Sequence, residues 1–320
     1  QEVTIAELLR KAGYRTGHFG KWHLTRLLDN QPQPTDHGFD HSLGTDNNAS
    51  PSHLNPNNFI RNGKAVGEMK GYSCQLVVDE AVAWLSKIKQ HDPDQPTFSC
   101  VWFHEPHTPI ASPPELVSKY QKRFPKLTKK QATYYANIEN VDDAVGRLMS
   151  KINSLGMEDN TLVFLTSDNG PLNDFSKVGL RGRKSHVWEG GHRVPGLFRW
   201  PGRIAAGSVC EAPIGGVDFL PTVCEIVGID PPGDRVIDGT SLYPLLQGKP
   251  QAFNRKNPLY WFFYRLNPAI AMRDGNWVII AESNDSQRLK SHPLIREDVA
   301  KIKSSRPVSY ELYDLDEDLS

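Results

Sequence analysis

The sequence predicts an α/β fold, with a mostly parallel central sheet flanked by helices and a small antiparallel α+β subdomain near the C-terminus. Two observations predict it. Short β-branched apolar runs alternate with longer segments of helical spacing, which is the pattern of parallel α/β sheets. After about residue 250, aromatic extended runs replace that alternation. With 320 residues, the chain is long enough for a main domain over 1–250 and a small one over 251–320.

Elements of the first 90 residues follow from local signals. Thr4-Ile5-Ala6-Glu7 fits a capping box that begins a helix, and Gly13 is expected to end it. A short strand is expected over 14–19. Residues 29–70 are rich in Asn, Pro, Gly and His, which predicts long loops. Apolar residues at helical spacing predict a helix over 71–90.

The next elements alternate between strand and helix. Residues 97–103 and 161–166 are short apolar runs, and we expect both to be buried strands. Between them, a long helix is expected over 129–155. Its apolar face consists of Ile138, Val141, Val145, Leu148 and Ile152. A further strand is expected over 197–200 and a helix over 217–227.

The last 70 residues have a different texture. Residues 259–264 are aromatic and extended. Residues 269–281 are expected to form a hairpin that turns at Asp274-Gly275, a dipeptide that favours two-residue turns. Together these runs predict the antiparallel subdomain.

Composition gives no support for several classes of partner. Lys plus Arg equals Asp plus Glu at 37 each, so the charge balance gives no support for a nucleic acid or an anionic membrane. No apolar run approaches the roughly 20 residues of a membrane span. The cysteines are Cys74, Cys100, Cys210 and Cys224. None has Cys-x-x-Cys spacing, so we expect buried free thiols, above all at Cys100 and Cys224.

Polar residues follow two of the predicted strands, where open α/β sheets bind their ligands. Asp168-Asn169-Gly170 follows the strand over 161–166. A carboxylate beside an amide oxygen suits Ca²⁺ or Mg²⁺, although the same residues also form Asx turns. His104 and His107 follow the strand over 97–103, as proton donors or as exposed loop histidines.

Two further segments carry cations. Lys21 and His23 are two residues apart, so in an extended segment they point the same way and suit a divalent oxyanion. The alternative is a surface lysine beside a buried tryptophan. Residues 180–195 concentrate Arg, Lys and His between glycines, which predicts either an anion site or a solvated loop.

The order and spacing of these segments closely resemble the type I, formylglycine-dependent sulfatase family of the alkaline phosphatase-like superfamily. The matching motifs are Gly-Lys-Trp-His, Pro-His-x-Pro, Ser-Asp-Asn-Gly, Leu-Arg-Gly-x-Lys and Glu-Gly-Gly-x-Arg-Val-Pro. They extend over nearly the whole chain. The resemblance implies an alkaline phosphatase-like fold and an arylsulfatase-like hydrolase of sulfuric esters.

The resemblance also implies roles for six residues. They are Lys21 and Lys184 for binding sulfate, His23 and His107 for catalysis, and Asp168 and Asn169 for binding one Ca²⁺ ion. His107 matches the general acid near the ester oxygen, a role for which His104 is the weaker candidate. His23 matches the histidine beside the formylglycine, which helps to expel sulfate.

The chain departs from the family at the nucleophile. No Cys or Ser here begins a Cys/Ser-x-Pro-x-Arg motif, and the family's paired N-terminal aspartates are missing. We therefore expect an N-terminally truncated fragment, inactive as written, whose nucleophile and remaining calcium ligands lie upstream of Gln1. The resemblance also implies maturation by a formylglycine-generating enzyme, and a periplasmic, secreted or lysosomal location.

Two other functions remain open. One is a non-catalytic protein that binds sulfated glycans. The other is a phosphate or phosphonate ester hydrolase of the same superfamily, which Asn169 disfavours because many such enzymes carry His there. The expected partner is a sulfated small molecule or glycan. A sulfated sugar is preferred because the loop 36–58 is polar; Asn47, Asn48 and His53 are candidate substrate contacts, or residues of a solvated loop.

Overall fold

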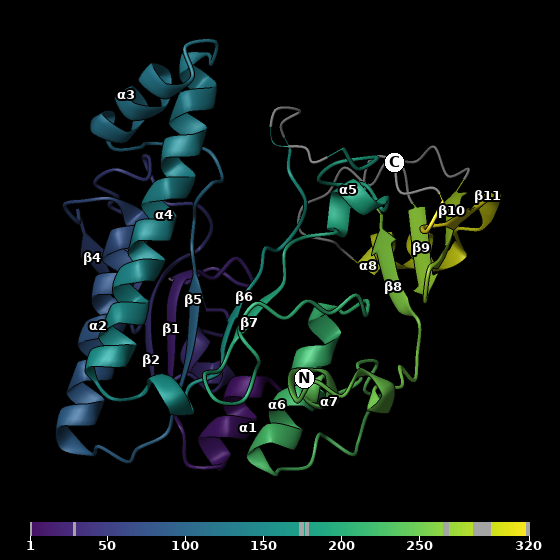
Figure 1. Ribbon diagram of the computed structural model, residues 1–320, viewed down its shortest axis with the longest axis horizontal. Coiled ribbons are helices and arrows are strands. Elements are labelled where there is room, and N and C mark those ends of the chain that lie inside the picture. Colours follow the sequence, from purple (N-terminus) through teal and green to yellow (C-terminus); the bar gives the residue numbers. More distant parts are fainter. Residues whose placement is uncertain are drawn as a thin grey trace. The chain divides into compact units, whose positions relative to one another are not determined.

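The computed structural model describes residues 2–27, 30–172, 176, 179–264, 269–283 and 296–317. The chain forms two compact units, Gln1–Asn160 and Thr161–Ser320. Figure 1 shows their elements. Within the described ranges, no helix has both the length and the apolar character needed to cross a membrane. The predicted domain boundary near residue 250 stays a prediction.

The first unit is built on a five-stranded sheet with the order β4-β3-β2-β1-β5. Its strands are β1 (Arg15–Lys21), β2 (His41–Thr45), β3 (Phe59–Arg61), β4 (Lys64–Gly67) and β5 (Thr97–Trp102). Strand β1 pairs in parallel with β2 and with β5, while β3 and β4 extend the sheet antiparallel. The carboxyl ends of β1, β2 and β5 therefore meet at one edge of the sheet.

Helices cover the sheet of the first unit on both faces. They are α1 (Ile5–Lys11), α2 (Ser73–His91), α3 (Pro114–Arg123) and α4 (Lys129–Ser154), with short 3₁₀ turns at Pro34–His37 and Glu158–Asn160. Ala6 of α1 packs with Phe39 in one apolar cluster, and Val77 of α2 packs with Phe19 in another. Helix α4 runs beside α2 and packs against it (Figure 1). The predicted capping box at Thr4 is present, since its Oγ1 accepts from the Glu7 N–H at 3.1 Å.

The prediction of long loops over 29–70 is wrong in part, because β2, β3 and β4 lie within that range. Strand β2 gave no apolar signal because its buried residues are partly polar. Ser42 is buried through hydrogen bonds to His18 and Asn62, and Thr45 through bonds to His104 and the Asn47 carbonyl. Helix α3, which has no buried residue, was not predicted.

The predicted apolar face of α4 is also partly wrong. Ile138 is 42% exposed, whereas Ala132, Ala136 and Ala144 are fully buried. Among them, Ala144 packs with Cys74 and Val78 of α2, where its small side chain allows the two helices a close contact. Asn137 is buried on the same helix because its amide bonds to His53 and to the Ala111 carbonyl.

The described residues of the second unit form two sheets. Strands β6 (Val163–Leu165) and β7 (Leu197–Arg199) pair antiparallel. A four-stranded antiparallel sheet has the order β11-β10-β9-β8, with β8 (Leu259–Phe263), β9 (Ala269–Asp274), β10 (Trp277–Ser283) and β11 (Pro307–Asp314). The helical segments are α5 (Glu189–His192), α6 (Phe219–Val227), α7 (Tyr243–Leu246), α8 (Arg296–Ser304) and 3₁₀ turns at Gly216–Asp218 and Pro250–Ala252. The predicted hairpin and C-terminal antiparallel subdomain are confirmed.

Two predictions about burial need correction. The strand predicted as a buried run over 161–166 is shorter, and Leu165 in it is 40% exposed. All four cysteines are free thiols. Cys74 and Cys224 are buried as expected, Cys100 is half-buried in β5, and Cys210 is exposed. Cys210 lies in an irregular segment that leaves its side chain in solvent.

Candidate functional site

The six predicted site residues divide between the two units. Lys21, His23 and His107 belong to the first, and Asp168, Asn169 and Lys184 belong to the second.

An amide joins Lys21 to His107 at the carboxyl edge of the first sheet. Lys21 ends β1, Asn48 follows β2, and His107 follows β5. Lys21 Nζ donates a hydrogen bond to Asn48 Oδ1 at 3.1 Å. Asn48 Nδ2 lies 2.9 Å from His107 Nδ1, and the Thr108 carbonyl oxygen lies 2.8 Å from the same Nδ1. A cation, an amide and an imidazole therefore form one connected group, with the imidazole exposed.

The loop that carries Asn48 is fixed by a second asparagine. Asn58 Nδ2 donates to the Asn48 carbonyl oxygen at 2.9 Å, and Asn58 Oδ1 accepts from the Ser50 N–H at 2.9 Å. Both ends of the Asn58 amide are thus bonded to the main chain. This arrangement holds the Asn48 backbone in place beside the sheet, which lets its side chain reach both Lys21 and His107.

His23 lies two residues beyond Lys21 on the same edge, with an exposed side chain. Its N–H donates to the Asp46 carbonyl oxygen at 2.9 Å, which continues the pairing that Trp22 makes with Thr45. Its φ of 51° places it in the left-handed region, which is uncommon for a residue other than glycine. Such conformations concentrate at functional sites. Asn48 bridges Lys21 and His107, and His23 lies two residues beyond Lys21 in sequence.

A buried histidine lies beneath this group. His104 is 1% exposed, and its Nε2 lies 2.8 Å from Thr45 Oγ1. Thr45 Oγ1 gives its own proton to the Asn47 carbonyl oxygen at 2.5 Å, so it accepts from His104 Nε2–H. Burial lowers the pKa of His104 to about 3, and repulsion from His53 and Lys21 adds to the effect. His104 is therefore neutral near pH 7 and is closed off from solvent, whereas His107 is exposed.

His53 is not a substrate contact, contrary to the sequence-based guess. Its side chain is fully buried, and its Nδ1 lies 3.2 Å from Asn137 Nδ2 and 3.9 Å from Glu105 Oε1. Burial lowers its pKa, while the Glu105 carboxylate opposes that shift. Asn47 is exposed at the same edge. Asn48, the third candidate substrate contact, bonds to two of the six predicted site residues, Lys21 and His107.

Glu105 has a structural role that the sequence did not reveal. Its Oε1 accepts hydrogen bonds from Ser73 Oγ and, at 3.0 Å, from the Cys74 N–H. These are the first residues of α2, whose N-cap residue Tyr72 supplies no side-chain hydrogen bond. A carboxylate at a helix N-terminus compensates for its free N–H groups and its dipole. Glu105 thereby ties the loop of His107 to α2.

In the second unit, main-chain hydrogen bonds bring Lys184 to the segment after β6. Asp168 and Asn169 follow that strand. The Gly170 N–H donates to the Gly191 carbonyl oxygen, and the Lys184 N–H donates to the Pro171 carbonyl oxygen, both at 2.9 Å. A Cβ at residue 170 would lie 2.0 Å from the Gly190 carbonyl oxygen, so only glycine fits there. The approach of two backbones sets the positions of Asp168, Asn169 and Lys184.

A buried carboxylate supports this contact. Glu189 begins α5 and is 6% exposed. Its Oε2 lies 3.3 Å from Arg193 Nη1 and 3.5 Å from Arg273 Nη1. Glu189 lies directly before the glycines that contact residue 170. The sequence offered Glu189 within its Glu-Gly-Gly motif but gave no signal for Arg273.

The donor atoms after β6 suit a hard cation. Asn169 Nδ2 donates to the Gly170 carbonyl oxygen at 3.0 Å, which leaves Oδ1 as the side-chain atom able to bind a metal. The exposed Asp168 adds a carboxylate. Oxygen donors of this kind fit Ca²⁺, which takes six to eight of them. In the described part of the chain, no cluster of three or more His, Cys, Asp or Glu side chains is arranged to hold a metal.

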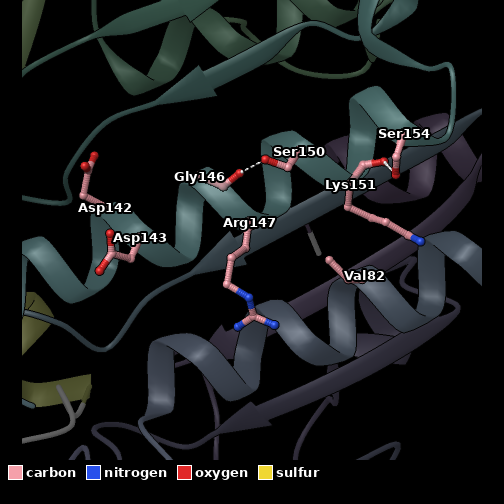
Figure 2. A pocket seen from close by; sticks show the side chains of 8 residues that line it. All are labelled: Val82, Asp142, Asp143, Gly146, Arg147, Ser150, Lys151 and Ser154. Carbon is pink, nitrogen blue, oxygen red and sulfur yellow. Dashed lines mark hydrogen bonds between the residues drawn. The ribbon is translucent and has the colours of Figure 1, made fainter.

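A surface groove runs along α4 and α2 of the first unit (Figure 2). Its lining consists of Val82, Asp142, Asp143, Gly146, Arg147, Ser150, Lys151 and Ser154. Arg147 extends from α4 toward α2, where it pairs with Asp79 and bonds to Gln75. None of the six predicted site residues lines the groove.

Comparisons with known proteins give a consistent family. A family model described as Sulfatase matches residues 1–229, and one described as N-sulphoglucosamine sulphohydrolase, C-terminal, matches residues 182–320. The uncharacterized sulfatase YdeN of Escherichia coli (strain K12) is 32% identical over 81% of this chain and 49% of its own length. The N-acetylgalactosamine-6-sulfatase of Mus musculus is 32% identical over 86% of this chain and 54% of its own.

A solved structure shares the fold. It is that of Ps i-CgsB in complex with k-i-k-neocarrahexaose, with a TM-score of 0.79 and 25% sequence identity. The alignment covers 99% of this chain and 68% of that protein. The present chain spans about half the length of the curated relatives it matches.

Proposed function

The chain belongs to the sulfatase family, and we propose that its protein releases inorganic sulfate from a sulfated carbohydrate. The observation that carries this proposal is the Lys21–Asn48–His107 group. It offers an ammonium for a sulfate oxygen and, one amide away, an imidazole for the ester oxygen. Transfer of a sulfuryl group needs both a cation at the sulfate and a proton for the leaving oxygen.

In the first unit, we assign sulfate binding to Lys21 and general acid catalysis to His107. His107 gives a proton to the leaving oxygen, so that it departs as an alcohol rather than an alkoxide. His23 is the residue proposed to assist the later expulsion of sulfate. His104 stays neutral beneath them, because its pKa of about 3 keeps it unprotonated near pH 7.

In the second unit, we assign a second sulfate contact to Lys184 and calcium binding to Asp168 and Asn169. A bound Ca²⁺ ion would supply positive charge to stabilise the sulfate oxygens. The main-chain bonds from Gly170 and Lys184 set the positions of these residues without using the side chains that bind. Their carboxylate, amide oxygen and ammonium thus stay available for ligands.

The nucleophile in this proposal is a formylglycine, made by a formylglycine-generating enzyme. Its hydrate supplies the oxygen that attacks sulfur. No Cys or Ser among the 320 residues begins a Cys/Ser-x-Pro-x-Arg motif, so the proposed nucleophile lies outside them.

The preference for a sulfated sugar rests on polar residues at the carboxyl edge of the first sheet. Asn47 is exposed there, whereas the Asn48 amide already bonds to Lys21 and His107. Amides suit the hydroxyl groups of a sugar, which both donate and accept hydrogen bonds. The mouse relative is named for a sulfated sugar, N-acetylgalactosamine 6-sulfate. The exposed Asn47 amide, rather than the names of the relatives, favours a carbohydrate over a steroid, because one relative is named steryl-sulfatase.

A direct test compares ester classes. The matured full-length protein should hydrolyse a chromogenic aryl sulfate, and its kcat/KM for the matching aryl phosphate should be lower. Faster hydrolysis of the phosphate would replace the sulfatase proposal with a phosphoesterase.

A second assay addresses the sugar. Sulfate release from sulfated mono- and oligosaccharides would be measured against release from a steroid sulfate. Activity on the steroid together with none on any sulfated sugar would overturn the carbohydrate assignment.

A further inference from the structure

The Asn48 amide has a defined orientation. An ammonium group can only donate hydrogen bonds, so Lys21 Nζ must face the amide oxygen, 3.1 Å away. The amide nitrogen then faces His107 Nδ1 at 2.9 Å. Because an amide NH₂ group can only donate, His107 Nδ1 must accept, and the ring carries its proton on Nε2.

A second neighbour of His107 Nδ1 requires this nitrogen to carry a proton. The Thr108 carbonyl oxygen lies 2.8 Å from His107 Nδ1 and can only accept a hydrogen bond. It therefore pairs with a protonated Nδ1. The two neighbours stabilise different protonation states of the ring. Asn48 favours the unprotonated Nδ1 as long as Lys21 holds its oxygen.

We propose that Asn48 is a positioning residue that couples anion binding at Lys21 to protonation of His107. A sulfate group bound to Lys21 takes the ammonium away from Asn48 Oδ1. The amide can then turn over, so that Oδ1 and the Thr108 carbonyl both accept from His107 Nδ1–H. This inference rests on the roles proposed above for Lys21 and His107.

The coupling places the proton where the reaction uses it. With an anion at Lys21, Nδ1 takes a proton from solvent and the ring carries protons on both nitrogens. The Nε2 proton then passes to the leaving oxygen, and the neutral ring keeps Nδ1–H on the Thr108 carbonyl. Without an anion, Asn48 keeps the ring neutral. The acid form is thus favoured when substrate is bound.

Other titratable groups near His107 have partners of their own. His53 interacts electrostatically with His107 but is buried and bonded to Asn137. Glu105, 3.9 Å from His53, accepts from Ser73 Oγ and the Cys74 N–H. These bonds do not involve the Asn48 amide, so they persist when that amide turns.

The test is nuclear magnetic resonance of the full-length protein with ¹⁵N-labelled histidine, with and without inorganic sulfate. In the wild type, His107 should show an unprotonated Nδ1 that becomes protonated when sulfate is added. In Asn48→Ala, Nδ1 should be protonated in both conditions, because the Thr108 carbonyl is its remaining partner. Asn57→Ala, an exposed asparagine of the same loop, should behave as the wild type.

Asn48→Asp provides a nearly isosteric second variant. A carboxylate can only accept hydrogen bonds, so in this variant His107 Nδ1 should be protonated even without sulfate. For Asn48→Ala, kcat on an aryl sulfate should fall about tenfold to a hundredfold, the range for loss of one hydrogen bond to a charged group.

Three results would overturn the inference. The first is the same protonation of His107 Nδ1 in the wild type and in both Asn48 variants. The second is a wild-type His107 whose protonation does not change when sulfate binds. The third is the absence of any sulfate binding, measured by calorimetry, that depends on Lys21. The resonance experiment reads the protonation of His107 without any turnover, so it is independent of the hydrolase assay. If the expected changes occur in a protein that hydrolyses no sulfate ester, the coupling is upheld and the proposed hydrolase function is rejected.

Discussion

The two units hold their candidate site residues by different means. In the first unit, side chains bond to each other at the edge of a parallel sheet, as Lys21, Asn48 and His107 show. In the second, two backbones approach so closely that Gly170 tolerates no side chain, and a buried carboxylate, Glu189, supports the contact. Substitution at the first should therefore change activity with little loss of stability. Substitution of Gly170 or Glu189 in the second unit should mainly lower stability.

Glu189→Ala breaks the second arrangement most strongly. The change leaves Arg273, whose side chain is 15% exposed, without its buried carboxylate. We expect the free energy of unfolding to fall by about 3 kcal/mol, as when one partner of a buried ion pair is removed. Urea titration measures it, with the exposed Glu225→Ala as the matched control. A loss of stability as small as that of the control would mean that Glu189 does not stabilise this contact.

Gly170→Ala tests the close approach of the backbones. Its new Cβ would lie 2.0 Å from the Gly190 carbonyl oxygen, so the chain must shift. We expect a loss of about 2 kcal/mol or more in the free energy of unfolding. Gly146→Ala is the control: no atom lies within 4 Å of its Cβ position in α4, and removing a helical glycine should stabilise by up to about 1 kcal/mol. Equal effects of the two substitutions would contradict the comparison.

Acid should weaken the first unit through a buried histidine. His18 is fully buried, and burial lowers its pKa to about 4, partly opposed by a hydrogen bond at Lys21. Below pH 6.5 the unfolded chain binds a proton that the folded chain does not. Stability from this residue is therefore complete above pH 6.5 and is lost as the pH falls toward 4.

The measurement compares pH 7 with pH 5. Over that interval the wild type should lose about 2 kcal/mol more of its free energy of unfolding than His18→Gln does. His91→Gln, an exposed histidine on α2, should keep the wild-type pH dependence. The same pH dependence in His18→Gln and the wild type would show that His18 is not held neutral by burial.

Thr45→Val should lower the stability of the first unit by a smaller amount. Valine keeps the shape but removes the oxygen that accepts from His104 Nε2 and donates to the Asn47 carbonyl. We expect a loss of about 1–2 kcal/mol in the free energy of unfolding, measured in urea at pH 7. An unchanged value would mean that these bonds add nothing net to stability.

Local signals predicted those parts of the fold that depend on local physics. The capping box at Thr4, the helix of α2 and the hairpin at Gly275 all follow from short patterns, and the structure confirms them. Strand β2 and the buried face of α4 were not predicted correctly, because polar residues in both are buried by hydrogen bonds to residues far away in sequence. Asn137 with His53 is such a pair, 84 residues apart in sequence.

The candidate site divides in the same way. Residues in compact motifs, such as Lys21 and His107, could be selected because the chemistry they offer is visible in their type and spacing. Arg273 could not, since its partner Glu189 lies 84 residues earlier in the chain and nothing near Arg273 marks it. His53 resembled a loop histidine in sequence, and only its burial corrected that interpretation.

The catalytic role of His107 is tested by measuring turnover and sulfate binding separately. The matured full-length protein and its His107→Ala variant would be assayed for sulfate release from an aryl sulfate and for binding of inorganic sulfate, with exposed His91→Ala as the control. We expect kcat to fall about 10²–10⁴-fold, as for loss of a general acid, while sulfate affinity changes little. Unchanged turnover in His107→Ala would contradict the proposed catalytic role of this histidine.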